Sequence, residues 1–251
     1  MKVVRIASFF VFLIVVWAII ARCQIWDSTL FPAPFKVAET LFDLARDGTL
    51  LNAVIVSLRR VYIGYAISMA IGVPLGVLLA QVEWVDDTLG SLVSAFQSLP
   101  SICWLPLALL WFGLNDRAIL FVIVMGSLVS IATAVKDGVR NLPPTYLRAA
   151  QTMGTSPFRT YTEVLIPASQ PAILTAAKLG WSYAWRALMS GELLFVSLGL
   201  GHILMMGREL ADMSQVLAVM IVIMTLGLGA EHLFFRPLET YVRRRWGFSP
   251  A

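Results

Sequence analysis

The stretch RAAQTMGTSPFRTYTEVLIP, residues 148–167, lies in the longest polar segment after the first hundred residues. TYLRAAQTM can form a helix, and Gly154 can take the left-handed conformation that ends it. Ser156 can cap a second helix, FRTYTEVL continues it, and Pro167 would end it. The pattern predicts two short helices on either side of Gly154, a shape suited to the groove of another protein.

The sequence on both sides of this segment is strongly apolar. The chain of 251 residues is 59% hydrophobic and 14% charged, and its mean hydropathy of +0.80 lies far outside the average for soluble domains. A helix needs about 20 mostly apolar residues to cross about 30 Å of hydrocarbon. The stretches that approach this length are 6–22, 61–80, 91–112, 118–135, 171–198 and 215–235. The predicted fold class is therefore an all-α integral membrane protein with about six transmembrane helices.

The N-terminal apolar run could be a signal peptide or a retained helix. The run from Ile6 to Ala21 is long for a signal peptide, and no small-x-small cleavage site follows it, so we favour a retained helix. In the polar segment that follows, Val37, Leu41 and Leu44 recur at helical spacing. This spacing predicts a short amphipathic helix that ends at Gly48.

Two predicted spans contain residues that an ordinary helix avoids. The second span contains Gly72, Pro74 and Gly76, and the third contains Pro100 and Pro106. Broken helices at membrane depth are tolerated where protein or a water-filled cavity receives the freed backbone groups. For Pro74 in the second span, a kink that only helps packing is an equal alternative. For the third, Gln97 and Ser101 favour a cavity lining, to which Trp104 could also belong.

The distribution of Lys and Arg predicts the orientation. With six spans, both termini share one side, and that side carries Lys2, Arg5, Lys136, Arg140, Arg148, Arg159, Arg236 and the cluster Arg243, Arg244 and Arg245. We therefore expect both termini to be cytoplasmic. Two features oppose this pattern: Lys36, Arg46, Arg59 and Arg60 fall in the first outer segment, and the loop from Gln81 to Leu89 is acidic.

The fifth predicted span carries Lys178, Arg186 and Glu192. Ionisable groups at membrane depth usually face a cavity or a partner. Ser182, Arg186 and Ser190 share one helical face, and a cation between two hydroxyls suits an anionic substrate. Equally, Arg186 could pair with a carboxylate on a neighbouring helix and only stabilise the bundle. Lys178 is close enough to the cytoplasmic end for its amine to reach the membrane surface.

Several other functions lack their usual signals. No Gly-rich loop precedes a Lys and a Ser or Thr, so we expect ATP hydrolysis on another chain and no enzymatic activity here. Cys23 and Cys103 have no partners at metal-ligand spacing, and we expect neither a metal nor a cofactor. The scattered basic residues do not suggest a nucleic-acid partner. A secondary transporter driven by an ion gradient is the principal alternative, although it would not need two docking helices.

The segment from Arg148 to Pro167 resembles the cytoplasmic signature loop of bacterial ABC importer permeases. The family pattern is Glu-Ala-Ala, three residues, Gly, nine residues, Ile-x-Leu-Pro. The positions that match it or carry a close substitute are Ala149, Ala150, Gly154, Ile166 and Pro167, with Val164 where Ile is usual. Arg148 stands where the pattern has Glu, which puts in doubt any ion pair that the Glu would make with the ATPase. The resemblance implies that these residues form an ATPase-docking loop.

The resemblance extends over most of the chain. SLPSICWLPLALLWFGLNDRAILFVIV, followed by VRNLPP, is similar to permeases that import nitrate, bicarbonate, taurine and aliphatic sulfonates. It implies the type I importer fold, a homodimer of permeases in the lipid of the bacterial inner membrane, two cytoplasmic ATPase subunits and an extracytoplasmic binding protein. Among the substrates, an aliphatic sulfonate is favoured.

We expect three parts along the chain. Residues 1–60 hold the first transmembrane helix and the amphipathic segment. Residues 61–236 form the permease core, with the coupling loop at 137–170, and residues 237–251 form a basic cytoplasmic tail. The predicted translocation pathway is formed by Gln97, Ser101, Trp104, Ser182, Arg186 and Ser190.

Overall fold

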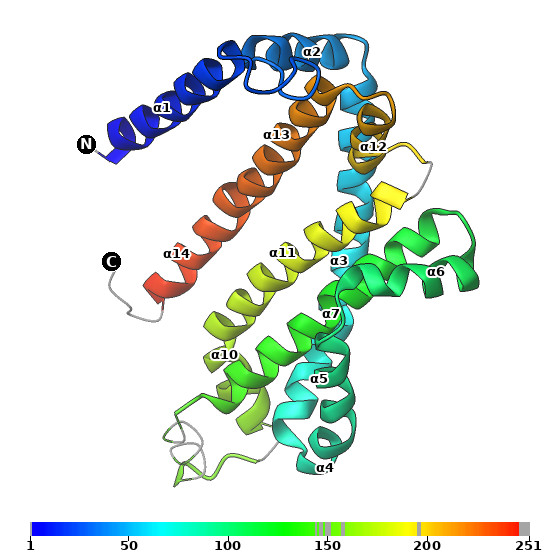
Figure 1. Ribbon diagram of the computed structural model, residues 1–251. Helices are drawn as coiled ribbons and strands as arrows, with labels where there is room; N and C mark the ends of the chain where they lie inside the picture. Colours follow the sequence, from blue (N-terminus) through cyan, green and yellow to red (C-terminus); the bar gives the residue numbers. More distant parts are fainter. Residues whose placement is uncertain are drawn as a thin grey trace. The chain divides into compact units, whose positions relative to one another are not determined.

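The computed structural model describes residues 2–143, 145, 148, 152–156, 159–194 and 197–245, and these residues form helices and connecting turns without a strand (Figure 1). This confirms the all-α fold class. The first helices are α1 (Lys2–Arg22), α2 (Pro34–Arg46), α3 (Thr49–Gln81) and α4 (Glu83–Val85), followed by the π-helix η1 (Asp86–Gly90) and α5 (Ser91–Gln97). Then come the 3-10 helix η2 (Ser101–Trp104), α6 (Leu105–Phe112), α7 (Asp116–Arg140), the π-helix η3 (Thr160–Leu165) and α10 (Ile166–Ala168). The last are α11 (Gln170–Leu194), α12 (Leu200–Glu209), α13 (Met213–Ala230), the π-helix η4 (Glu231–Phe235) and α14 (Arg236–Arg245).

The chain divides into two compact units. One consists of Met1–Leu58 with Glu192–Leu226, and the other of Arg59–Gly191 with Gly227–Ala251. The second unit contains the packed centre of α3, α7 and α11, and it holds the candidate functional site.

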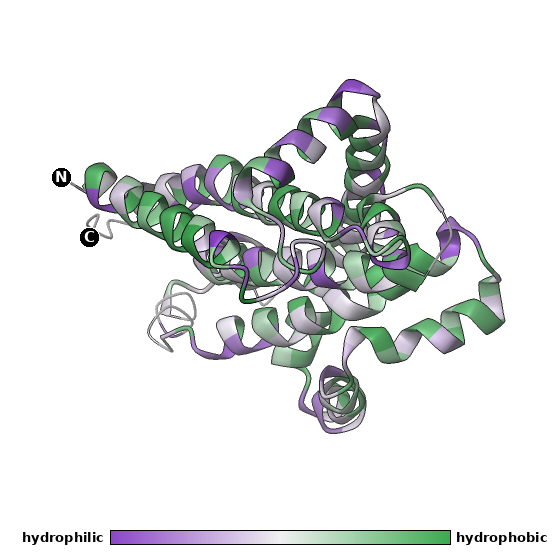
Figure 2. Ribbon diagram, turned by 45° about the horizontal axis from the view of Figure 1, so that its top comes forward, coloured by the Kyte–Doolittle hydropathy of each residue, from purple (hydrophilic) through white to green (hydrophobic). Residues whose placement is uncertain are grey.

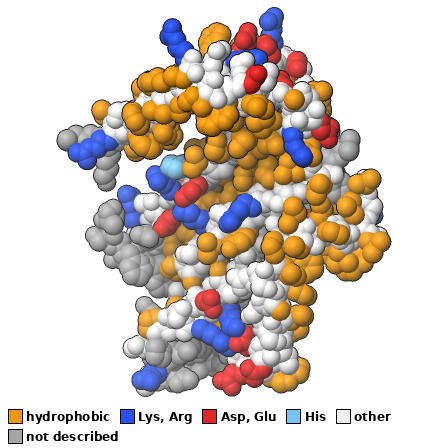
Figure 3. All heavy atoms as spheres, in the orientation of Figure 1, with side chains coloured by type: hydrophobic (Ala, Val, Ile, Leu, Met, Phe, Trp, Pro, Cys, Tyr) orange, Lys and Arg blue, Asp and Glu red, His pale blue; other side chains and the backbone are white. Residues whose placement is uncertain are grey.

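Apolar helices long enough to cross a membrane are present in the described residues. They are Val4–Arg22, Thr49–Gln81, Asp116–Arg140 and Met213–Val242. A further pair, Glu83–Gln97 and Ser101–Phe112, qualifies together but is bent by 104°. Figure 2 shows hydrophobic residues over most of α1, the helix at the N label, and hydrophobic side chains cover much of the face in Figure 3. The remaining predicted span is α11, which is 25 residues long but less apolar because it carries Lys178, Arg186 and Glu192.

Small residues allow α3 to lie directly against α7. Four residues of α3 at four-residue intervals face four residues of α7 at the same intervals: Gly64 with Ile123, Ser68 with Ser127, Gly72 with Ile131, and Gly76 with Val135. A Cβ on Gly76 would lie 2.5 Å from the carbonyl oxygen of Ala132, so no larger residue fits there without a backbone shift. Close approach at small residues is a common way for membrane helices to associate. Of the two interpretations of the interruption at Pro74, a cavity or packing, the contacts of the flanking Gly72 and Gly76 support packing.

The order of these contacts along α3 and α7 shows how the bent helix pair, Glu83–Gln97 and Ser101–Phe112, connects them. Residue numbers rise together along α3 and α7, so the two helices run parallel. The connecting residues 82–115 must therefore return to the end at which α3 began. The bent pair is thus one broken span, and its break follows Gln97, next to Pro100 as the sequence predicts.

The contacts of α11 run the other way. Gly138 meets Ala172, Ile131 meets Gly180, and Ile119 meets Gly191, so α11 is antiparallel to α7. The segment after it turns again, because Gly227 lies against Trp185 and Lys178 contacts Glu231, so this segment is antiparallel to α11. Successive segments from α3 to η4 therefore alternate in direction, as consecutive membrane spans must.

The second span is longer than its apolar stretch indicates. The sequence suggests residues 61–80, whereas α3 begins at Thr49, so Arg59 and Arg60 lie within a helix and not in a loop. Arg60 is buried, with 6% of its side chain exposed, and its Nη2 lies 2.6 Å from Oδ1 of Asp116 at the start of α7. The amphipathic prediction is confirmed: α2 ends at Arg46, Val37 is buried, and Gly48 has a positive φ of 79°.

Candidate functional site

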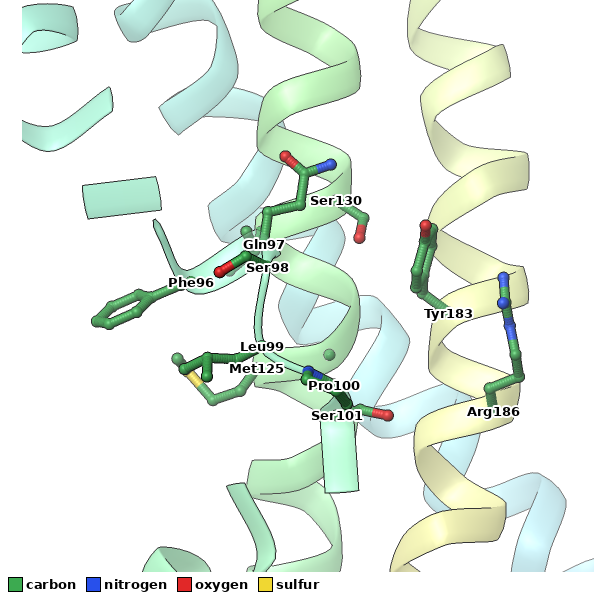
Figure 4. Close-up of a pocket in the computed structure, with 12 residues that line it drawn as sticks. Phe96, Gln97, Ser98, Leu99, Pro100, Ser101, Met125, Ser130, Tyr183 and Arg186 are labelled. Atoms are coloured by element: carbon green, nitrogen blue, oxygen red, sulfur yellow. The ribbon is translucent and has the colours of Figure 1, made fainter. Parts of the chain in front are cut away.

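A cavity of about 310 Å³ opens beside the break in the third span (Figure 4). Its walls come from the break itself, from α7 and from α11. The lining residues are Phe96, Gln97, Ser98, Leu99, Pro100, Ser101, Met125, Gly126, Val129, Ser130, Tyr183 and Arg186. Of the six residues predicted for the pathway, the cavity thus brings together Gln97, Ser101 and Arg186.

Arg186 is exposed at the cavity and has neutral neighbours. Its Nε donates to the carbonyl oxygen of Ser182 at 3.1 Å, and its guanidinium carbon lies 4.5 Å from the centroid of the Tyr183 ring. In the described part of the chain, Arg186 forms no ion pair, so the structural alternative of a carboxylate partner finds no support there. The other cation of α11 differs, since Nζ of Lys178 lies 2.7 Å from Oε1 of Glu231. Lys178 therefore pairs across the helices, where the sequence suggested a reach to the membrane surface.

The other three predicted pathway residues do not line the cavity. The hydroxyls of Ser182 and Ser190 donate to the carbonyl oxygens of Lys178 and Arg186 in their own helix, at 3.3 Å and 3.0 Å. Trp104 packs edge-on against Phe96, which lines the cavity, and their ring centroids are 5.1 Å apart. These contacts show that a shared helical face does not by itself bring residues to one cavity.

Among the cavity residues that were missed from the sequence, Tyr183 and Ser130 carry hydroxyl groups. Tyr183 lies three positions before Arg186 on α11, so the i, i+3 spacing could have signalled it. Ser130 is buried on α7, and its hydroxyl makes no hydrogen bond within the described residues. Ser127, one turn earlier, lies 2.7 Å from both Ser68 Oγ and the carbonyl oxygen of Ile123. Nothing in the sequence distinguishes these two serines.

Glu192 lies in the other unit and is fully buried. Its carboxylate accepts hydrogen bonds from Ser57 Oγ at 2.7 and 2.8 Å and from the backbone N–H of Gly201 at 3.1 Å. Ser57 Oγ in turn accepts from the N–H of Leu200 at 2.9 Å. Glu192 thus fixes the start of α12 to α3, as a buried carboxylate with several donors can.

The polar loop is described in part. Arg148 is helical and exposed, whereas Ala149 and Ala150 lie outside the described residues. Gly154 has a φ of 70°, as the pattern predicts, and a Cβ on it would have no atom within 4 Å. Ser156 Oγ accepts from the N–H of Arg159 at 3.5 Å, a long contact at the expected cap position.

The expectation that Pro167 ends a helix is wrong. The π-helix η3 leads directly into α10, where Pro167 lies in the first turn. The turn falls instead at Ser169, whose N–H and hydroxyl both donate to the carbonyl oxygen of Leu165, at 2.9 and 2.6 Å. Ile166 is exposed beside it.

Both ends of this loop are attached to one apolar cluster. Leu165, at the end of η3, is buried with Ile131, Val135 and Val139 of α7 and with Ala176 of α11. The loop therefore leaves α7 and returns to α11 at the same place.

Residues 72–234 match the family described as the inner membrane component of binding-protein-dependent transport systems. The chain belongs to this family. A putative ABC transporter permease protein of Methanocaldococcus jannaschii is 31% identical over 220 residues, which cover 86% of this chain and 82% of the relative. The taurine transport system permease protein TauC of Escherichia coli is 27% identical, covering 84% of this chain and 78% of TauC. The nitrate import permease protein NrtB of Synechocystis is 26% identical and covers 96% and 90% of the two chains.

Solved structures show the same fold. An inward-facing structure of the MetNI methionine ABC transporter aligns with a TM-score of 0.70 at 20% identity, covering 77% of this chain and 96% of that chain. An amino acid ABC transporter aligns with a TM-score of 0.61 at 18% identity, covering 82% and 97%. The chain is thus an ABC importer permease subunit in a membrane and not an enzyme, and its family works with a separate ATPase and a substrate-binding protein. The predicted family and the type I importer fold are confirmed.

Proposed function

We propose that this permease moves a small oxyanion, with an aliphatic sulfonate favoured over nitrate, taurine or bicarbonate, and that the cavity at Arg186 lies on its path. The observation that carries the proposal is the placement of Arg186 at a cavity that other polar side chains also line, with no carboxylate partner among the described residues. Relatives named for taurine, nitrate and aliphatic sulfonates support an oxyanion.

The cavity has the chemistry that an oxyanion needs. A guanidinium offers a planar fork of donors that fits two oxygens of a sulfonate or nitrate. The guanidinium lies over the Tyr183 ring, and this cation–π contact stabilises it without neutralising its charge. Gln97, Ser101 and Ser130 add groups that can donate to the anion. An anion that loses its water at membrane depth would recover hydrogen bonds and charge compensation here.

The first test is uptake into proteoliposomes that contain the complete complex. Arg186→Gln should reduce uptake about tenfold while assembly with the ATPase is unchanged, because the neutral amide no longer offsets the desolvation of the anion. Uptake by Arg186→Lys should lie between that of the unchanged protein and that of Arg186→Gln, because an ammonium keeps the charge but lacks the planar fork. Arg208→Gln, which removes an exposed arginine outside the cavity, is the control. Unchanged uptake in Arg186→Gln would show that the path lies elsewhere.

Competition in the same assay decides the substrate. An excess of an alkanesulfonate should inhibit uptake more than nitrate, taurine or bicarbonate does. If nitrate competes best, the sulfonate assignment is wrong and the oxyanion assignment stands.

We further propose that the docking loop of Arg148, Ala149, Ala150, Gly154, Ile166 and Pro167 contacts the ATPase, and that two copies of this permease form the pathway. Gly154→Val should uncouple transport although the protein still inserts, because a β-branched residue is strained at a φ of 70°. The space around Gly154 is open, so a steric clash would not explain the effect. Gly154→Asn, which tolerates the left-handed region, should retain most uptake. Equal loss in both variants would argue against the conformational explanation.

Finally, we propose that both termini are cytoplasmic. After Cys23 and Cys103 are replaced by Ser, Met153→Cys should react with a membrane-impermeant maleimide only in permeabilised cells, whereas Leu210→Cys should react in intact cells. Both side chains are well exposed, at 81% and 68%. The reverse labelling would refute this orientation.

A further inference from the structure

An ion cluster joins the start of the broken span to the end of α7. The carboxylate of Asp86, in η1, accepts from Lys136 Nζ and from Arg140 Nη1, the latter at 2.9 Å. Only 14% of the Asp86 side chain is exposed, and 19% of Lys136. The acidic loop that opposed the predicted charge pattern is therefore neutralised in part by basic residues of the next span.

The same cluster reaches a third helix. Arg140 Nη2 also donates to the carbonyl oxygen of Leu79, in the last turns of α3, at 3.2 Å. On the other side, Gly90 is buried against the carboxylate, and a Cβ there would lie 2.1 Å from Asp86 Oδ1. A side chain at residue 90 would displace the carboxylate of Asp86 from this position.

The three joined segments lead to the two functional regions. Beyond Arg140, α7 continues into the docking loop, whose far end returns to the same core at Leu165. Beyond Gly90, η1 continues into α5, which ends at Gln97 on the cavity wall. Asp86 is thus the charged contact between the helix that carries the docking loop and the segment that lines the cavity.

We propose that Asp86, Lys136 and Arg140 form a brace that passes displacement of the docking loop to the broken span, so that ATPase action reshapes the cavity at Gln97. This rests on the proposed roles of the docking loop and of the cavity. A charged contact suits this role because a partly buried ion pair with two donors is directional and costly to separate, whereas apolar side chains can slide past one another. Asp86 is a positioning residue and makes no contact with substrate in this scheme.

The test measures the accessibility of residue 97 on the cavity wall, so it does not require that the substrate be known. In the complete complex, with Cys23 and Cys103 replaced by Ser, the rate at which a maleimide labels Gln97→Cys is measured without nucleotide and with ATP and vanadate. With the brace intact, nucleotide should change this rate severalfold. In the added Asp86→Asn background the nucleotide effect should disappear, while ATP hydrolysis continues and the ATPase still co-purifies.

Two further variants separate a brace from general stabilisation. Asp87→Asn removes the adjacent, exposed carboxylate and should leave the nucleotide effect intact. Asp86→Lys combined with Lys136→Asp restores opposite charges and should recover part of the effect, which a change that only lowers stability would not allow.

The proposal is overturned if Asp86→Asn keeps the full nucleotide effect, or if nucleotide has no effect on Gln97→Cys with the brace intact. It is also overturned if Asp86→Asn and Asp87→Asn reduce the effect equally. Failure of the oxyanion proposal would look different, because Arg186→Gln would then leave uptake unchanged while the labelling results at Gln97 stood.

Discussion

Two faces of α11 differ in their neighbours and in their roles. On one face, Gly180 and Ala187 lie against α7, and a Cβ on Gly180 would be 2.3 Å from Cγ1 of Ile131. On the other face, Ser182, Tyr183 and Arg186 are exposed, and Tyr183 and Arg186 line the cavity. The face that packs on α7 has no room for a ligand. On the face that lines the cavity, the charge of Arg186 has no carboxylate partner within the described residues.

The comparison shows what decides the role of a polar or small residue in a membrane helix. Lipid is as apolar as the helix surface, so helices associate through close packing at small residues and not through the hydrophobic effect. An ionisable group must then find a partner or a cavity. Lys178 forms an ion pair with Glu231, and Arg186 lines the cavity. The neighbouring helix, and not the residue type, makes the difference.

The largest effect is expected where the packed face is overfilled. Gly180→Ala should lower the free energy of unfolding by about 1 to 3 kcal/mol, because Ile131 is itself fully buried and cannot move away freely. Thermal unfolding of the detergent-solubilised protein measures the change. Gly229→Ala is the matched control, since a Cβ there meets nothing within 4 Å. It should be neutral or stabilise by up to about 1 kcal/mol through helix propensity.

A double variant sharpens this prediction. Ile131→Val removes a terminal methyl group that would lie 2.6 Å from the new Cβ, so Gly180→Ala should cost less in that background. Additive effects of the two substitutions would place the strain elsewhere, since residues in contact are expected to couple.

Most of the fold could be predicted from the sequence, because the lipid core imposes a minimum length of apolar residues on each span. The break at Pro100 and the turn at Gly154 were also predictable, because proline and glycine act on the local backbone. The extension of α3 back to Thr49 was not, since Arg59 and Arg60 interrupt the apolar run. Arg60 is accommodated by Asp116, a partner that is 56 residues away in the sequence.

The site could be predicted only where local spacing carries the information. Arg186 and the Gln97 to Ser101 break were found because a charge and a proline are conspicuous in an apolar span. Ser130 and the partners of Lys178 and Asp86 were not found, because they depend on which helix faces which. A single sequence contains no record of such distant contacts.

The second prediction compares the two cations of α11. Lys178→Met should destabilise the protein by only about 0.5 to 1 kcal/mol. It leaves Glu231 without its ion-pair partner, but both side chains are slightly more than one third exposed, which weakens the pair. Lys178→Met combined with Glu231→Gln should recover part of this loss. Arg186→Met should change stability less, because no carboxylate partner is lost, while it reduces uptake. Equal destabilisation by both single substitutions would mean that Arg186 also has a structural partner in the assembled transporter.

The smallest effects, and the sharpest contrast, are expected at two serines one turn apart on α7. Ser127→Ala removes a buried hydroxyl that lies 2.7 Å from Ser68 Oγ, so it should lower the free energy of unfolding by about 0.5 to 1 kcal/mol and leave the KM for uptake unchanged. Ser130→Ala removes a hydroxyl that lines the cavity and has no hydrogen bond within the described residues, so stability should stay nearly constant. If the anion accepts a hydrogen bond from Ser130, loss of about 1 kcal/mol of binding raises KM about fivefold. The two measurements must be made on both variants, because only opposite patterns separate packing from pathway. A raised KM in Ser127→Ala with none in Ser130→Ala would reverse the assignment of the two faces of α7.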